Sequence, residues 1–245
     1  MTFSIDQFRL DGKTAIVTGA GGRGNSIGRA YALGLSAAGA SVIVADLNGP
    51  GATTVAEEIT AAGRRAVAVA VDITRADEVA AMVEAGVSAF GGVDILVNNA
   101  ALMLEVGSPQ AADVPLDQWN RLLDVNVTGA LMCIQAVVPH MRKRGGGHIV
   151  NQVSGGACPA VSIYGVSKLA LIGLTTTLAK QLGGQGINVN AIAPGNAMSE
   201  PGAKLVPPGS PFAQFLAMNV CTRPRVCPRN WSGPCFCYAR MPENG

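Results

Sequence analysis

Tyr164 and Lys168 stand four residues apart in the segment SIYGVSK, and Ser154 precedes the tyrosine by ten residues. Residues at positions i and i+4 share one face of a helix, so a helical segment would place the phenol beside the ammonium. A neighbouring positive charge favours the phenolate and lowers the pKa of a tyrosine. The pair therefore predicts a group that gives and takes protons near neutral pH.

The elements that must position this pair follow a regular alternation. Short, apolar, β-branched runs, typical of strands covered on both faces, alternate with segments of helical periodicity. The expected strands are 13–18, 41–46, 66–72, 93–98, 147–153 and 187–193, and the expected helices are 27–38, 51–62, 76–90, 116–142 and 162–182. This rhythm predicts an α/β fold with a single doubly wound parallel sheet of Rossmann type and right-handed crossovers.

Composition and charge narrow the classes of function. The 245 residues suffice for one large domain, and the 49% hydrophobic and 14% charged content is that of a compact cytoplasmic enzyme. A net charge of +2 gives no argument for nucleic acid or a membrane surface. No apolar run approaches the roughly 20 residues that span a bilayer. Residues 1–12 lack the apolar centre of a signal peptide, so export is not expected.

Cysteine and histidine spacing does not indicate a metal site. Four of the six cysteines crowd the C-terminal segment: Cys221, Cys227, Cys235 and Cys237. They lack a Cys-x-x-Cys pair and a late histidine, and nothing points to an oxidising compartment that would favour disulfides. His140 and His148 flank a basic turn and are interpreted as surface residues.

The first expected strand runs into the glycine-rich turn TGAGGRGNSIG, residues 18–28, and then into a helix. Glycines let the backbone approach a pyrophosphate, and a helix N-terminus supplies free N–H groups and the positive end of a dipole. A merely flexible turn is the alternative. The strand–turn–helix context favours a dinucleotide.

Acidic and amide side chains end the next strands. Asp46 ends the second, where a carboxylate can bind the adenosine ribose hydroxyls and repel a 2′-phosphate, so we expect NAD rather than NADP. Arg23 in the glycine turn argues the other way, and Asp46 could instead be a capping aspartate. Asp72 could receive the adenine amino group, and Asn98 and Asn99 lie at the carboxyl edge, where such sheets bind ligands.

Taken together, these residues resemble the short-chain dehydrogenase/reductase family over residues 10–199. The resemblance implies that Tyr164 is the general acid/base and that Lys168 binds the nicotinamide ribose and lowers the tyrosine pKa. Ser154 would hold the substrate oxygen, and Asn126 would sit in a helix and anchor a water in the proton relay. Ser154 could alternatively be a strand-end serine, Asn126 a satisfied buried amide and Tyr164 a packed helix residue.

The resemblance also implies the partners of the protein. These are a small alcohol or ketone substrate and the other subunits of a homodimer or homotetramer, without a metal. The implied cofactor contacts are Gly19, Arg23, Ser26, Ile27, Gly28, Asp46, Leu47, Asp72, Ile73, Asn98, Asn99, Ala100, Tyr164, Lys168, Pro194, Gly195 and Ser199.

The chain departs from the family pattern within the site. The glycine turn is about three residues longer than usual, so the middle glycine falls on Ser26 when counted back from Gly28 and on Arg23 when counted forward. Ala101 replaces a family glycine after Asn98-Asn99-Ala100. The shortened gap between the serine and the tyrosine holds Cys158 and Pro159.

The largest departure lies in residues 223–245, which show no apolar period of 2 or 3.6 and predict an irregular tail. We hypothesise a frameshift product, because codons permitted from Pro224 onward, read two bases later, encode a helix-forming segment like that of the family. A genuine divergent tail is the alternative. Without the family's last strand, one edge of the sheet would be exposed and, by the resemblance, part of the subunit interface would be lost, which puts the oligomer in doubt.

The most specific expectation is a catalytic and NAD-binding domain over residues 1–222 that interconverts a secondary alcohol and a ketone. A lid over about 196–220, rich in apolar residues, would suit an apolar or ring-containing substrate, although these residues could equally pack under a loop. One alternative is an NADPH-dependent 3-oxoacyl thioester reductase, which Arg23 permits and Asp46 opposes. Another is a nucleotide-binding protein inactivated by its altered C-terminal segment.

Overall fold

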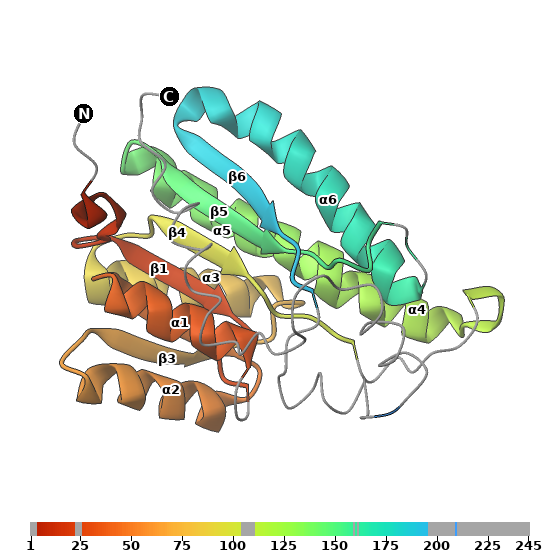
Figure 1. Cartoon of the computed structure of the whole chain (residues 1–245), viewed down its shortest axis with the longest axis horizontal. Helices are drawn as coiled ribbons and strands as arrows, with labels where there is room; N and C mark the ends of the chain where they lie inside the picture. The colour runs from red at the N-terminus through yellow and green to blue at the C-terminus, as the bar shows by residue number, and fades with distance from the viewer. Residues whose placement is uncertain are drawn as a thin grey trace.

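The computed structural model describes residues 4–22, 26–103, 111–158, 160, 162–195 and 209 of the chain. Six parallel strands form one sheet in the order β3-β2-β1-β4-β5-β6 (Figure 1). The strands are β1 (Thr14–Thr18), β2 (Ser41–Asp46), β3 (Ala66–Ala70), β4 (Ile95–Asn98), β5 (Gly147–Gln152) and β6 (Ile187–Ile192). The predicted doubly wound, Rossmann-type sheet is confirmed. The expected irregular tail lies outside the described residues.

All strands are parallel, but the side of the sheet to which the chain adds new strands changes between β3 and β4. The chain builds β1, β2 and β3 outward and then crosses to β4 on the other side of β1. Open α/β sheets bind ligands beyond the carboxyl ends of their strands at such a point. The glycine-rich turn after β1 and the Asn98-Asn99 pair at the end of β4 flank it.

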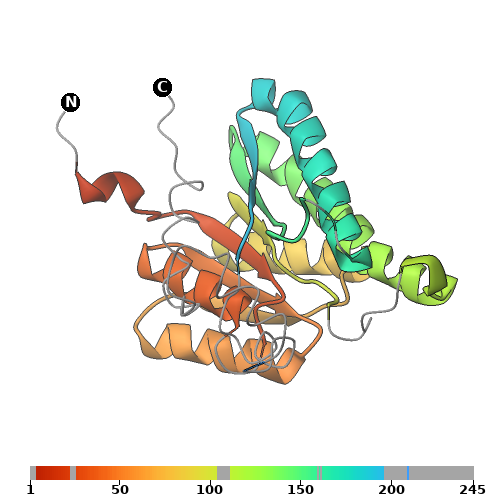
Figure 2. The same ribbon diagram turned by 45° about the vertical axis from the view of Figure 1, so that its right-hand side comes forward.

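Helices cover both faces of the sheet, as Figures 1 and 2 show. The apolar strands are therefore buried on both sides, and every residue of β1 is buried. One core lies between β1, β2 and the pair α1 and α2, and a second lies between the sheet and the pair α3 and α5. The helices are α1 (Ile27–Ala37), α2 (Gly49–Ala61), α3 (Ala76–Phe90), α4 (Leu116–Leu123), α5 (Ala130–Lys143) and α6 (Ile163–Leu182).

The long helix expected over 116–142 is interrupted. A π-helical turn, η3 (Asp124–Gly129), separates α4 from α5. The helix passes close to the chain after β3 here: a Cβ on Gly129 would lie 2.8 Å from the side chain of Ile73. Single π-helical turns inside α-helices are frequent at functional sites. Apolar periodicity cannot distinguish this turn from continuous α-helix.

The helical run Leu116–Lys143 is long and apolar enough, by length and composition, to cross a membrane. The expectation that no apolar run reaches this length was therefore wrong. Within the fold, Cys133, Ile134 and Val137 of this run are buried in the core between α5 and the sheet. This packing is that of a core helix.

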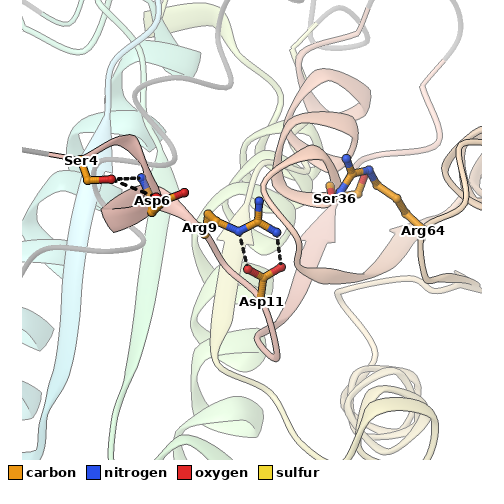
Figure 3. A network of polar contacts seen from close by, with 6 residues as sticks. All are labelled: Ser4, Asp6, Arg9, Asp11, Ser36 and Arg64. Carbon is orange, nitrogen blue, oxygen red and sulfur yellow. Dashed lines mark hydrogen bonds and ion pairs between the residues drawn. The ribbon is translucent and has the colours of Figure 1, made fainter.

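The chain before β1 is fastened to the body of the molecule. The 3₁₀ turn η1 (Ile5–Phe8) leads into an ion pair between Arg9 and Asp11, which Figure 3 shows. Leu10, between them, is 1% exposed, and its N–H donates to the carbonyl of Ala38 at 2.8 Å. This anchor holds the entry to β1 beside the end of α1.

At the amino edge of the sheet, a buried carboxylate joins the first residue of β1 to the turn between α5 and β5. Asp94 is 3% exposed, and its Oδ2 accepts from the Thr14 backbone N–H at 2.9 Å. Its Oδ1 accepts from Arg144 Nε at 2.8 Å. His148, on β5 nearby, is half-buried, and burial lowers its pKa. The interpretation of His148 as a surface residue was wrong, because β5 carries it into the sheet.

Candidate active site at the carboxyl edge of the sheet

The structure places Tyr164 and Lys168 in the first turns of α6. Ser162 begins this helix, because its side chain accepts from the Gly165 N–H and so satisfies one free donor of the first turn. Lys168 Nζ lies 5.6 Å from the centroid of the Tyr164 ring. The expected neighbourhood of phenol and ammonium is present in the helix.

Burial sets the protonation of the pair. Lys168 is 1% exposed, and its Nζ donates to the carbonyl of Gln152 at 2.9 Å. Desolvation lowers the pKa of Lys168 to about 8 and raises the pKa of Tyr164 to about 12. The sequence predicted a lowered tyrosine pKa, and the direction is the opposite, because the loss of water outweighs the neighbouring charge.

Ser154 stands in a turn directly after β5. Its Oγ accepts from the Gly156 N–H at 3.1 Å, which leaves its own O–H as a donor. The next residue, Gly155, donates its N–H to the carbonyl of Pro194 at 3.0 Å. This bond brings the Pro194-Gly195 segment after β6 against the serine turn, as the shared carboxyl edge predicts.

Asn126 lies in η3 and is 1% exposed. Its Oδ1 accepts from Leu102 N at 2.8 Å, and its Nδ2 donates to Leu102 O at 3.1 Å and to Ser167 Oγ at 3.0 Å. Ser167 Oγ in turn donates to the carbonyl of Tyr164 at 2.7 Å. The side-chain amide is thus buried and satisfied, and it ties the chain after β4 to the Tyr164 turn of α6. That Asn126 also anchors a water in the proton relay stays a prediction.

The glycine-rich turn and the end of β4 are packed closely against each other and are joined by hydrogen bonds. Gly19 has φ +67, and a Cβ on Gly28 would lie 2.1 Å from the carbonyl oxygen of Gly19. Asn99 Nδ2 donates to the carbonyls of Thr18 and Gly19, both at 2.9 Å. A Cβ on Gly19 would meet the backbone of Ala100 at 2.7 Å. A larger residue at Gly19 or Gly28 would push the glycine-rich turn away from its neighbours.

Asn98 belongs to a buried polar chain. It is 4% exposed and donates to Asn151 Oδ1 at 2.9 Å, and Asn151 donates to Thr175 Oγ1 at 2.9 Å. These two hydrogen bonds connect β4 and β5 to α6, so the role of the Asn98 side chain is to hold these three elements together. Asn151 and Thr175 were missed by sequence reasoning, and their signal was a polar side chain inside an apolar strand and helix.

Asp46 ends β2 at the same edge, and Leu47 follows it. Asp46 is half-buried, and its carboxylate accepts from the backbone N–H groups of Gly21 and Asn48, both at 2.8 Å. Leu47 is 75% exposed. Asn48, which sequence reasoning missed, starts α2 as its N-cap, and an asparagine before Gly-Pro-Gly is a recognisable signal for that position.

The turn after β3 contains Asp72 and Ile73. The pKa of Asp72 is lowered, chiefly because the side chain and backbone of Thr74 donate to its Oδ1 at 2.7 and 2.9 Å. Ile73 is 7% exposed and belongs to the core around α5. Its side chain is a packing group of this core.

The remaining predicted residues divide between the start of α1 and the undescribed segments. Ser26 is the N-cap of α1 and accepts from Arg29 N, so the place of a middle glycine is taken by a helix cap. Ile27 is the first helical residue and packs against the core. Arg23 and Ser199, the lid over 196–220 apart from Gly209, and the tail over 223–245 lie outside the described residues.

The residues present fit a nicotinamide dinucleotide. Gly19 and Gly28 form a cradle that a Cβ would fill. Among the described residues, Gln152 O is the single hydrogen-bond acceptor of the buried Lys168 ammonium, which leaves N–H donors for a sugar hydroxyl. The Asp46 carboxylate retains acceptor capacity beyond its two backbone bonds.

The two described cysteines, Cys133 and Cys158, are both free. Burial raises the pKa of Cys133 to about 12, and Cys158 is exposed as a free thiol. The described residues also contain no group of three or more His, Cys, Asp or Glu side chains that could hold a metal ion.

Known proteins resemble this chain in sequence and in fold. A model of the short chain dehydrogenase family matches residues 13–207. An uncharacterized oxidoreductase of Mycobacterium tuberculosis is 47% identical over 186 residues, 76% of this chain and 74% of that protein. The 7α-hydroxysteroid dehydrogenase of Escherichia coli K12 is 39% identical over 201 residues, 81% of this chain and 76% of that protein.

A solved 7α-hydroxysteroid dehydrogenase complexed with NADH and 7-oxo glycochenodeoxycholic acid has a TM-score of 0.86 to this structure. It is 33% identical, over 98% of this chain and 91% of that one. The chain therefore belongs to the short-chain dehydrogenase/reductase family of nicotinamide-dependent oxidoreductases.

Proposed function

We propose that this protein is an NAD(H)-dependent oxidoreductase that interconverts a secondary alcohol and a ketone. The observation that carries the proposal is the Tyr164–Lys168 pair in the first turns of α6, next to the Ser154 turn at the carboxyl edge of the sheet. A phenol, a buried ammonium and a hydroxyl donor at one edge are what proton transfer to a carbonyl oxygen requires.

Each side chain has a defined task in this proposal. The bound nicotinamide supplies or accepts the hydride at the carbinol carbon. With its pKa raised to about 12, Tyr164 is a protonated phenol at neutral pH, and it donates that proton to the oxygen as a ketone is reduced. The Ser154 O–H donates to the same oxygen and stabilises its developing charge. Solvent then returns a proton to the tyrosinate.

Lys168 supports the phenol from within the fold. Its ammonium, fixed by the Gln152 carbonyl, binds the nicotinamide ribose and stabilises the transient tyrosinate. In the direction of alcohol oxidation Tyr164 must first lose its proton. Oxidation should therefore become faster as the pH rises from neutral toward about 8, above which Lys168 loses its charge, and ketone reduction should be faster at neutral pH.

Asp46 carries the choice of cofactor, and the relatives suggest the substrate. A carboxylate at the end of β2 binds ribose hydroxyls and repels a 2′-phosphate, which supports NAD. The 7α-hydroxysteroid dehydrogenase relative supports an apolar, ring-containing ketone as substrate. Residues 1–222 would form the catalytic domain, in a homodimer or homotetramer.

The test is NADH binding by fluorescence, followed by NADH and NADPH oxidation with a panel of ketones that includes ring ketones and 3-oxoacyl thioesters. Tyr164→Phe should lower kcat by at least 100-fold. Its Kd for NADH should stay within about threefold of wild type, because the ring remains. Tyr31→Phe is the matched control: it removes the hydroxyl of a buried tyrosine of α1 and should retain turnover.

Each alternative has its own outcome. Turnover that survives in Tyr164→Phe would show that another group donates the proton. Preference for NADPH with 3-oxoacyl thioesters would favour the thioester reductase. Tight NADH binding without turnover across the panel would identify a nucleotide-binding protein that has lost catalysis.

A further inference from the structure

The turn between β2 and α2 is hydrogen-bonded to the glycine-rich turn at two points. Asp46 Oδ2 accepts from the Gly21 N–H at 2.8 Å, and Asn48 Nδ2 donates to the Gly21 carbonyl at 3.1 Å. The N–H and the C=O of this one glycine are thus bound by side chains from a single turn. We call these two bonds the Gly21 clasp.

Asn48 makes further bonds that connect the clasp to its surroundings. Its backbone N–H donates to Asp46 Oδ1 at 2.8 Å. Its side-chain Oδ1 accepts from the Gly51 N–H at 3.3 Å and so caps α2. One side chain therefore has two separable tasks: the oxygen caps a helix, and the nitrogen holds the glycine-rich turn.

The two turns are in direct contact. A Cβ on Gly51 would lie 2.0 Å from the Gly21 carbonyl oxygen, and a Cβ on Gly21 would lie 2.5 Å from the Ala52 nitrogen. Backbone this close cannot shift toward the helix, and the clasp opposes shifts away from it. The first part of the glycine-rich turn thus has one position relative to Asp46.

We propose that Asn48 is a positioning residue of the cofactor site: through Gly21 it sets the distance between the pyrophosphate cradle and the Asp46 carboxylate. The inference rests on the proposed NAD(H) function. A dinucleotide spans both points, because its pyrophosphate lies at the glycine-rich turn and its adenosine ribose at the acid after β2. Holding both before binding removes an ordering cost from the affinity.

Asn48→Ser separates the two tasks of this residue. Serine is as good an N-cap as asparagine, so α2 stays capped, but it has no amide nitrogen to reach Gly21. We expect a melting temperature close to wild type and a Kd for NADH raised about fivefold, the worth of one partly exposed hydrogen bond. With NADH saturating, kcat should stay near wild type. Discrimination between NADH and NADPH should weaken, because Asp46 is less firmly placed.

Two comparison variants complete the experiment. Asn48→Ala removes the cap as well, so it should show the same rise in Kd together with a lower melting temperature. Gly51→Ala should also raise the Kd, since its methyl group displaces the Gly21 carbonyl. Gly183→Ala, where a Cβ meets nothing within 4 Å, should leave the Kd unchanged.

The outcomes separate the inference from the proposed function. A wild-type Kd for NADH in Asn48→Ser, with only Asn48→Ala impaired, would overturn the inference and leave Asn48 as a helix cap. Failure of the wild-type protein to bind NADH or NADPH would instead overturn the proposed function.

Discussion

At the scale of single residues, burial governs the chemistry of the Tyr164–Lys168 pair. An ammonium that is 1% exposed with one carbonyl acceptor is costly to keep charged. The folded protein nevertheless keeps Lys168 buried, and a lysine with a lowered pKa in a candidate site is a common sign of function. We therefore expect Lys168 to lower the free energy of unfolding while it supports catalysis.

Replacing Lys168 with Met tests that trade-off. The pKa falls from its ordinary 10.5 to about 8, and each unit is worth about 1.4 kcal/mol. After subtracting the lost bond to Gln152, we expect Lys168→Met to raise the free energy of unfolding at pH 7 by about 2 kcal/mol. Turnover should be lost. Urea denaturation with a kinetic assay measures both.

The pH dependence has a definite sign. A lysine whose folded pKa is depressed is charged in both states below pH 8, so the burial penalty is then fully present. Between pH 8 and 10.5 the folded state releases its proton first, and wild-type stability rises relative to the variant. The advantage of methionine should shrink across this window. A destabilised Lys168→Met at pH 7 would show that the ammonium supports the fold.

At the scale of elements, the amino edge of the sheet depends on Asp94. Its carboxylate binds the first residue of β1 and the basic turn that follows α5. Arg144, in the basic turn between His140 and His148, is thus an ion-pair partner of this buried acid. The contact lies at the edge opposite the candidate active site, so it bears on stability rather than on catalysis.

Asp94→Asn should therefore lower stability without lowering kcat. The Thr14 N–H and the Arg144 Nε bind different oxygens of Asp94, and an asparagine keeps only one of these as an oxygen, so one donor loses its acceptor. Because Arg144 is about one-third exposed, we expect a loss of roughly 2 kcal/mol by urea denaturation. Asp77→Asn is the control, since the Arg75–Asp77 pair is exposed and its loss should not be measurable. Equal effects of the two substitutions would contradict this role of Asp94.

At the scale of the whole molecule, β6 forms one edge of the sheet that the described residues build. Among the described residues, β6 has β5 as its single neighbour. An unpaired parallel edge exposes backbone donors and acceptors that a further strand would satisfy. We propose that segment 224–245 departs from the family through a shift of reading frame, and that the family-like segment stabilises the molecule.

Exchange of residues 224–245 for the alternative-frame segment PGLPEELVGALLLLCSDAGEW tests this proposal. We expect a higher urea midpoint and a shift to a dimer or tetramer by light scattering, because an amphipathic helix would restore apolar cover. A scrambled segment of the same composition should do neither. An unchanged midpoint and mass would support a genuine divergent tail.

Much of the fold was readable from the chain. β2 runs over the residues expected, 41–46, and so does α3 over 76–90, because apolar periodicity and flanking glycines report local burial directly. The strand after α2 ends at Ala70 rather than 72, an ordinary boundary difference. The π-helical turn η3 was not readable, since it arises where Gly129 passes Ile73, a contact between segments far apart in sequence.

The sequence by itself determined the family, the parallel sheet and which residue types gather at its carboxyl edge, because strand order and local spacing place them there. The tertiary structure decided what those residues do to one another. Burial raises the pKa of Tyr164. The Asn126 side-chain amide is hydrogen-bonded to Leu102 and Ser167, and the Asn48 side chain is hydrogen-bonded to Gly21. Desolvation and hydrogen-bond partners depend on distant segments packing together, and no local pattern encodes them.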